Sequence, residues 1–194
     1  MKNKVTTKII AGKYKGRLLE LPALDTTRSS KSILKESFFN VLQFDIIDTI
    51  FIEAFGGSGS IGLEALSRGA KELFFCEIDR KSYRTLQNNC NSIDSSSCTT
   101  IFGDTFEKLP IVLEQLKNKN DEIIVYIDPP FDFRDGMSEI YEKSFDMVKN
   151  ITNSNVTLVT FEHMTGLEMP EKLGMFNKFK EKKFGKSSLT YYYI

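Results

Sequence analysis

The sequence predicts an α/β domain built on one mostly parallel β-sheet, with helices on both faces and an antiparallel edge formed by the C-terminal strands. Three observations predict this fold class. Short β-branched runs alternate with stretches of helical periodicity between residues 50 and 163. A glycine-rich turn follows the first of these runs. Two further β-like runs end the sequence with no helical stretch between them.

The N-terminal segment precedes this alternation. Residues 7–21 hold two apolar runs around the turn GKYKG, which is the pattern of a small β-hairpin. Residues 29–43 carry apolar side chains at helical spacing, with Ser29 or Ser30 as candidate N-cap. We therefore expect a basic hairpin extension over residues 1–28 and a main domain over residues 29–194.

The alternating elements follow in order. Strands are expected at 50–55, 71–79, 98–104, 122–128 and 155–163, and helices at 59–70, 80–93 and 138–151. In residues 106–119 we expect a short turn and then a helix. Runs at 173–185 and 187–194 bring the expected sheet to seven strands.

Composition excludes several classes of protein. A chain of 194 residues with 41% hydrophobic residues can build one sizeable core. The sequence has no apolar stretch of about 18 residues, so we expect no membrane helix. The N-terminus lacks the apolar segment of a signal peptide. Cys76, Cys90 and Cys98 show no paired spacing, so we expect core cysteines, a reduced cytoplasmic compartment and no metal.

The charge is unevenly distributed although the net charge is zero. Residues 1–35 carry nine basic and two acidic residues, whereas residues 36–170 carry 11 basic and 22 acidic ones. Glycine and tyrosine are interleaved with the charges in AGKYKGR, which favours contact between the N-terminal segment and a polyanion. For the six C-terminal lysines, a polyanion contact and a solubilising surface remain equally open.

The turn EAFGGSGSIGLEAL, residues 53–66, predicts a nucleotide site. Its glycines allow close approach of a ligand to the backbone at a helix N-terminus. GSGSIG also matches a dinucleotide fingerprint, but that match alone is weak. Glu53 and Glu77 stand at the ends of successive strands, where they suit the amino group and ribose hydroxyls of S-adenosylmethionine. Asp104 suits the adenine amine, while Glu77 would equally suit NAD.

The motif DPPF closes the fourth strand, beside the expected cofactor crevice. Methyl transfer to an exocyclic amine needs acceptors that orient the nitrogen and draw off its developing positive charge. The Asp128 side chain and the Pro129 carbonyl are such acceptors, and Pro130 makes the turn rigid. Phe131 offers a ring on which a base can stack. These four residues form the predicted catalytic motif.

Two residues at the end of the fifth expected strand are weaker candidates. His163 is the sole histidine and fits a hydrogen-bonded loop residue better than a general base. For Glu162, lining the pocket and a purely structural role are equally open.

Together these motifs resemble the RsmD family of bacterial 16S rRNA guanine-N2 methyltransferases, which are class I S-adenosylmethionine-dependent enzymes. The resemblance covers nearly the whole chain, through IIAGKYKGRLL (9–19), KESFFNVL (35–42), GSGSIGLEALSRGA (57–70), CEIDR (76–80) and DPPF (128–131). DPPF by itself is shared with DNA adenine and protein glutamine methyltransferases. The N-terminal segment and the LEALSRGA helix narrow the resemblance to RsmD.

The resemblance implies a Rossmann-like class I methyltransferase fold and methyl transfer to the N2 of a specific guanine in 16S rRNA, within an assembling 30S subunit. It implies a cofactor site at Glu53, Ala54, Phe55, Gly57, Ser58, Gly59, Glu77, Ile78, Asp104 and Thr105. The RNA contacts expected are Lys13, Lys15, Arg17, Arg28, Lys31 and Lys35, of which Arg17, Arg28 and Lys35 would face RNA or the pocket. We expect a monomer.

Three other functions remain open at this point. A methyltransferase acting on DNA adenine or on a protein amide would share the motif, although no large target-recognition domain is evident for the DNA version. An NAD(P)-dependent enzyme would use the glycine turn but not Asp-Pro-Pro-Phe. A non-catalytic RNA-binding module would not need Asp128.

Overall fold

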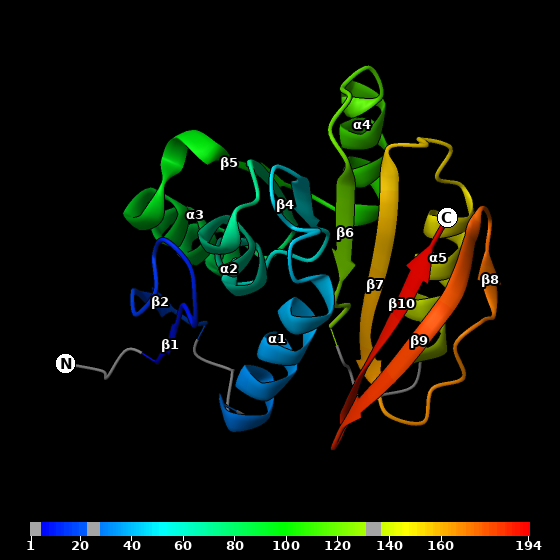
Figure 1. Cartoon of the computed structure of the whole chain (residues 1–194), viewed down its shortest axis with the longest axis horizontal. Helices are drawn as coiled ribbons and strands as arrows, with labels where there is room; N and C mark the ends of the chain where they lie inside the picture. Colours follow the sequence, from blue (N-terminus) through cyan, green and yellow to red (C-terminus); the bar gives the residue numbers. More distant parts are fainter. Residues whose placement is uncertain (1–4, 23–27, 131–136) are drawn as a thin grey trace.

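An eight-stranded β-sheet forms the centre of the computed structural model, which describes residues 5–22, 28–130 and 137–194 (Figure 1). Its strand order is β5-β4-β3-β6-β7-β10-β9-β8. The parallel strands are β3 (Ile50–Glu53), β4 (Glu72–Glu77), β5 (Cys98–Phe102), β6 (Ile123–Ile127) and β7 (Val156–Met164). The antiparallel strands are β8 (Lys172–Leu173), β9 (Phe176–Phe184) and β10 (Ser187–Tyr193). The seven expected strands are confirmed, and the two-residue β8 extends the edge.

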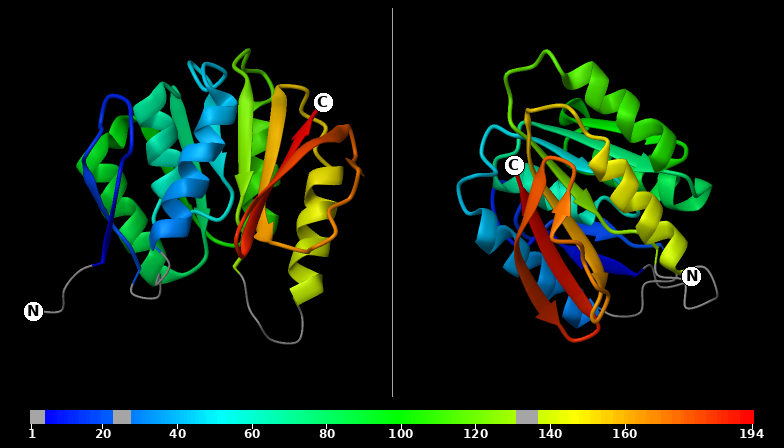
Figure 2. Two further views of the ribbon diagram at one scale, coloured as in Figure 1. Left: turned by 60° about the horizontal axis from the view of Figure 1, so that its bottom comes forward. Right: turned by 90° about the vertical axis from the view of Figure 1, so that its right-hand side faces the viewer.

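Helices cover both faces of this sheet, as the alternation predicts (Figure 2). One face carries α1 (Arg28–Leu42), α2 (Ser60–Arg68) and α3 (Arg80–Ile93). The other carries α4 (Thr105–Leu116) and α5 (Met137–Lys149). A short 3-10 helix, η1 (Ser95–Ser97), leads into β5. Each face therefore has its own apolar core, and the sheet separates the two.

Helix α4 differs from the expected turn followed by a helix. It is one continuous helix with Pro110 inside it. The Asp104 side chain accepts a hydrogen bond from the Phe106 amide at 3.0 Å, which caps the helix one residue before Thr105. The cap starts the helix early enough that Pro110 lies within it, where the missing N–H removes one helical hydrogen bond. The expectation of a separate turn was wrong for this reason.

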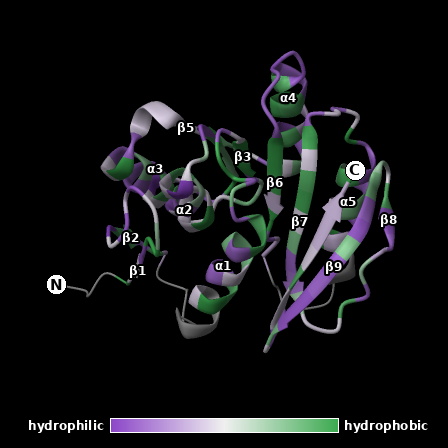
Figure 3. Ribbon diagram, viewed as in Figure 1, coloured by the Kyte–Doolittle hydropathy of each residue, from purple (hydrophilic) through white to green (hydrophobic). Residues whose placement is uncertain are grey.

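The central strands are buried on both faces, which explains their continuous apolar sequences. All five residues of β6 are buried, and Figure 3 shows β6 and β7 in mostly hydrophobic colours, whereas β9, next to the short edge strand β8, is mostly hydrophilic. Phe38 of α1 packs against this centre, with its ring centroid 4.9 Å from that of Tyr126 and 6.2 Å from that of Phe51. Aromatic packing therefore sets α1 against β3 and β6.

The three cysteines are core residues, as expected. Cys76 and Cys90 are buried, Cys98 is half-buried against the same core, and all three are free thiols. Within the described ranges, no helix combines the length and the apolar character needed to cross a membrane.

The N-terminal hairpin is confirmed as a separate two-stranded sheet of β1 (Thr6–Lys8) and β2 (Leu18–Glu20). It packs on the α1–α3 side through Ile9 and Leu19, both buried. Asn89 of α3 pairs with the backbone of Glu20, accepting from its N–H and donating to its carbonyl, both at 2.9 Å. The hairpin is thus joined to the main domain by core contacts and by backbone hydrogen bonds.

The carboxylate of Glu64 anchors the start of the hairpin loop, just after β1. This fully buried side chain of α2 accepts hydrogen bonds from the amides of Ile10 (2.7 Å) and Ala11 (3.0 Å). The Arg68 Nε donates to it at 2.8 Å, and the Lys35 Nζ lies 3.5 Å away. One buried carboxylate therefore connects the hairpin, α1 and α2.

We predict that Glu64→Ala lowers the free energy of unfolding by about 3–5 kcal/mol, because it leaves a buried lysine and two amides without their acceptor. The measurement is urea unfolding followed by circular dichroism. The matched control is Glu114→Ala, which removes an exposed carboxylate paired with Lys117 and should cost less than about 0.5 kcal/mol. Equal effects of the two substitutions would contradict the anchoring role.

Candidate active site

Four acidic residues follow the strands at the carboxyl edge of the sheet. Glu53 and Glu77 end β3 and β4, Asp128 follows β6 directly, and Asp104 lies two residues after β5. The strand order places them along the edge as Asp104, Glu77, Glu53 and Asp128. Neighbouring strands lie about 4.8 Å apart, so this row has the length of an extended small molecule.

The glycine turn between β3 and α2 is tied to its surroundings through backbone groups. Gly57 and Gly59 have φ angles of 51° and 73°, the left-handed region that glycine adopts without strain. The Gly57 amide donates to Glu77 Oε2 at 2.8 Å, and Asn89 Nδ2 donates to the Ser58 carbonyl at 2.8 Å. The turn is thus held against the end of β4 and against α3.

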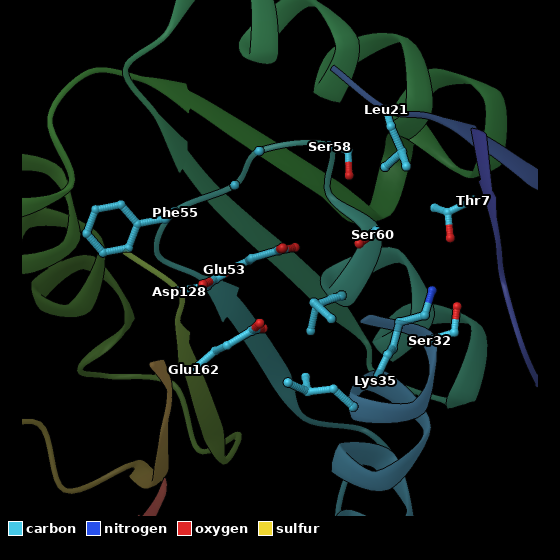
Figure 4. Close-up of a pocket in the computed structure, with 14 residues that line it drawn as sticks. Thr7, Leu21, Ser32, Lys35, Glu53, Phe55, Ser58, Ser60, Asp128 and Glu162 are labelled. Atoms are coloured by element: carbon cyan, nitrogen blue, oxygen red, sulfur yellow. The ribbon is translucent and has the colours of Figure 1, made fainter. Parts of the chain in front are cut away.

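A cavity lies between this turn, the hairpin and α1 (Figure 4). The residues expected at the site that line it are Glu53, Phe55, Gly57, Ser58, Lys35 and Asp128. Thr7, the middle residue of β1, and Leu21, which directly follows β2, form part of its wall. The basic hairpin is therefore a wall of the site as well as an extension beside it.

Glu53 is a buried acid of the cavity. Its Oε2 accepts a hydrogen bond from the Gly62 amide at 2.8 Å. Only glycine fits at this position, because a Cβ there would lie 2.4 Å from the Phe75 ring. Burial raises the pKa of Glu53 to about 8, while the Gly62 hydrogen bond and the charge of Lys35 act in the opposite direction. A cationic ligand group in the cavity would favour the ionised carboxylate.

The remaining residues expected at the cofactor site lie around the turn. Ala54 is buried and its carbonyl accepts a hydrogen bond from the Thr105 hydroxyl. Ile78 is 62% exposed just beyond Glu77. The Asp104 carboxylate caps α4 and lines a separate hollow between α4 and α5 rather than the cavity that holds Glu53. Its expected contact with adenine stays a prediction.

Asp128 stands at the tip of β6 and faces the same cavity as Glu53 (Figure 4). Pro129 after it is buried and Pro130 is exposed. Phe131, the last residue of the predicted motif, lies outside the described residues. The structure thus brings the acid of the motif to the glycine turn, as expected from the edge that parallel strands share.

The structure changes the interpretation of Lys35. It was expected among the RNA contacts, facing RNA or the pocket, but only 3% of the residue is exposed. Its ammonium donates to the Lys8 carbonyl at 3.1 Å and pairs with Glu64, and burial lowers its pKa. The helical spacing places Lys35 on the same apolar face as Phe38 and Leu42. That spacing was the available signal for burial, but the charge of the side chain suggested exposure. Lys35 lines the cavity and is not a surface phosphate contact.

The other expected RNA contacts divide into two groups. Lys13, Lys15 and Arg17 are exposed on the loop of the hairpin. The side chains of Arg28 and Lys31 lie outside the described part of the chain. RNA contact by these residues stays a prediction.

His163 is a buried core residue in β7 rather than a loop residue. Its Nε2 is hydrogen-bonded to the Thr190 hydroxyl at 2.8 Å and its Nδ1 lies 3.0 Å from the Met164 carbonyl. Burial lowers the pKa of His163 below its usual value. The residue therefore satisfies its own polar groups within the sheet, and its neighbour Glu162 lines the cavity instead.

The sequence interpretation missed two supporting residues, Glu64 and Asn89. Both are polar residues inside otherwise buried helix surfaces, which was the available signal. Their hydrogen bonds to the hairpin reach backbone more than 50 residues away, so no local pattern could identify these partners.

The hydrogen-bond acceptors at the cavity and at the neighbouring strand end suit S-adenosylmethionine. That molecule carries an ammonium group and a ribose diol, which need anionic or carbonyl acceptors. Glu53 in the cavity and Glu77 at the end of the adjoining strand supply carboxylates. The glycine turn between them lets a ligand approach the backbone closely. Among the described residues, no group of three or more His, Cys, Asp and Glu side chains is arranged to hold a metal ion.

A mostly parallel sheet in this strand order, with a glycine turn after its first strand and an Asp-Pro-Pro turn after its fourth, is the fold of class I methyltransferases. Within that class, the chain belongs to the RsmD family. The family model described as Conserved hypothetical protein 95 matches residues 7–193.

Relatives and solved structures agree with this family. Ribosomal RNA small subunit methyltransferase D from Haemophilus influenzae is 33% identical over 127 residues, which cover 65% of this chain and 64% of that protein. The match thus spans slightly less than two thirds of that relative. The protein of the same name from Buchnera aphidicola (Acyrthosiphon pisum) is 25% identical over 88% of this chain and 85% of its own. The solved Escherichia coli structure of yhhF has a TM-score of 0.75 and 25% identity, covering 97% of this chain and 98% of that one.

The raised pKa of Glu53 predicts how stability depends on pH. The folded pKa of about 8 lies above the ordinary 4.5, so the folded protein retains a proton that the unfolded chain has released. The stability that this proton provides is complete below pH 4.5 and is lost as the pH rises through 8. Glu53→Gln should remove this loss, so that the difference in unfolding free energy from wild type changes by about 1.4 kcal/mol per pH unit in that window. Urea unfolding of the cofactor-free proteins measures it, and parallel curves would contradict the prediction.

Proposed function

We propose that this protein transfers a methyl group from S-adenosylmethionine to the exocyclic N2 amine of a specific guanine in 16S rRNA of the assembling 30S subunit, acting as a cytoplasmic monomer. The observation that carries the proposal is the shared cavity: Asp128 and Glu53 face the same space beside the glycine turn, and the basic hairpin forms its wall. The RsmD-named relatives support an rRNA substrate.

The chemistry assigned to this cavity depends on Asp128. The amine nitrogen of guanine is a poor nucleophile because its lone pair is delocalised into the ring. Hydrogen bonds from its two N–H groups to the Asp128 carboxylate and the Pro129 carbonyl would orient the nitrogen and stabilise its developing positive charge. Bound S-adenosylmethionine supplies an electrophilic methyl group on a sulfonium. As the new N–C bond forms and the S–C bond breaks, the amine loses one proton, for which Asp128 is the adjacent acceptor.

The cofactor roles follow the order of the acids along the sheet. Glu53, with its buried carboxylate, suits the ammonium group, and Glu77 suits the ribose hydroxyls one strand away. RNA would reach the cavity over the exposed Lys13, Lys15 and Arg17 of the hairpin. Thr7 and Leu21 line the cavity, while the loop that carries these basic residues lies at the other end of the hairpin, against Ser67 and Ser92.

Tritiated methyl transfer tests the proposal. Purified protein is incubated with labelled S-adenosylmethionine and 30S subunits from a strain that lacks this modification, with free 16S rRNA in parallel. Nucleoside analysis should find the label in N2-methylguanosine from the 30S sample. Label in DNA or protein instead would select the alternative substrates that share the Asp-Pro-Pro motif. Bound cofactor with no transfer to either rRNA sample would overturn the substrate assignment.

Asp128→Asn should lower kcat by about 10²–10³-fold, because it removes a charged acceptor that acts as the transition state forms. The affinity for S-adenosylmethionine, measured by calorimetry, should change by less than threefold. The control is Asp121→Asn, a partly exposed carboxylate near the opposite end of β6 that pairs with Lys71. A loss of cofactor binding in the Asp128 variant would mean that its catalytic role is misassigned.

The double substitution Lys13→Glu and Lys15→Glu should weaken binding to 30S subunits, because both side chains are exposed on the hairpin loop. The slope of log affinity against log salt should become shallower by about 1–2. Filter binding at several salt concentrations measures both quantities. Lys117→Glu with Lys149→Glu, which reverses two charges on the α4–α5 side, is the matched control. Equal losses in the two double variants would place the RNA surface elsewhere.

A further inference from the structure

A second carboxylate stands directly beside the catalytic acid. Strand β7 runs parallel to β6 with Ile127 paired to Phe161, so the next residues in each strand are Asp128 and Glu162. Residues two apart in a strand share a face. Asp128 and Glu162 therefore lie on the same side of the sheet as Tyr126, and both line the cavity that holds Glu53.

Glu162 is held in place by its neighbour. It is 3% exposed, and its Oε2 accepts a hydrogen bond from the Tyr126 hydroxyl at 2.7 Å. The Tyr126 ring is fully buried against Phe38 and Phe51 and cannot move freely. Figure 4 shows the Glu162 carboxylate pointing into the cavity next to Glu53 and Asp128. Burying a carboxylate is costly, so its place beside the motif calls for a reason.

The substrate proposed above supplies a reason for this carboxylate. In guanine, the N2 amine is adjacent to the N1–H donor. In adenine, the exocyclic amine is adjacent to an N1 acceptor instead. The Asp-Pro-Pro turn can hold the amine of either base, so it does not distinguish them. A second acceptor beside the turn pairs with the N1–H of guanine and repels the N1 lone pair of adenine.

We propose that Glu162 is a specificity-determining residue that accepts a hydrogen bond from N1–H of the target guanine while Asp128 holds its N2 amine. This inference rests on the proposed function. It explains how a motif shared by several amino methyltransferases is restricted to guanine in this chain, through the residue on the strand next to the motif.

The test uses 2,6-diaminopurine, which keeps the N2 amine but has an acceptor at N1. After the modified guanine is mapped, 30S subunits are reconstituted with ligated 16S rRNA that carries either guanine or 2,6-diaminopurine at that position. The ratio of kcat/KM for the two substrates is measured for wild type and for Glu162→Gln, whose amide can donate to the N1 acceptor. Glu122→Gln, at an exposed position before β6, is the matched control.

Wild type should prefer guanine by at least 100-fold, since a site built to bind an N–H group rejects analogues that lack it. Glu162→Gln should reduce this preference at least tenfold, with unchanged affinity for S-adenosylmethionine, while Glu122→Gln retains it. A preference that stays the same in Glu162→Gln, even with lower rates for both substrates, would show a structural role and overturn the inference.

Wild type alone can also overturn it. Equal methylation of 2,6-diaminopurine and guanine by the unaltered protein would exclude recognition of N1–H, whether or not the variant folds. Failure of the unaltered protein to methylate guanine in 30S subunits would instead overturn the proposed function, and this inference with it. The two failures are therefore distinguishable by one set of substrates.

Discussion

The buried carboxylate of Glu64 is the interaction on which the arrangement of the site depends. It holds two backbone amides of the hairpin loop, the ammonium of Lys35 in α1 and the guanidinium of Arg68 in its own helix. Lys35 in turn bonds the Lys8 carbonyl and lines the cavity. Breaking such a buried network leaves several polar groups without partners at once. The hairpin is therefore a fixed wall of the site rather than an independent arm.

Much of this fold could be predicted from local pattern, because its parallel strands are buried on both faces and its helices are amphipathic. Helix α3 has the bounds that the periodicity predicts. Asp79 caps its N-terminus, and the spacing of Leu86 and Cys90 defines its inner face. The convergence of Glu53 and Asp128 was also predictable, since parallel strands share a carboxyl edge. The turn expected before α4 was wrong, because Asp104, which was expected to end the preceding strand, caps this helix.

What local pattern could not supply were partners that depend on register and on packing between distant elements. Lys35 carries a charge that suggests solvent, yet the hairpin folds over it and Glu64 neutralises it. Glu162 was ambiguous in the sequence because its neighbour across the sheet was unknown. The pairing of Ile127 with Phe161 removes that ambiguity by placing Glu162 beside Asp128. The residue proposed to decide specificity is thus one whose role depends on tertiary contacts.

The strand order itself imposes a direction on the proposed chemistry. From β5 to β7 the acids are Asp104, Glu77, Glu53, Asp128 and Glu162, one for each successive strand. The roles assigned to them begin with adenine, ribose and the amino-acid group of the cofactor and continue with the target amine and the adjacent edge of the base. Neighbouring strands about 4.8 Å apart space these acceptors at the scale of one chemical group each. A change of substrate would therefore be expected at the β7 end of this row, because the proposed cofactor roles are assigned to the other end.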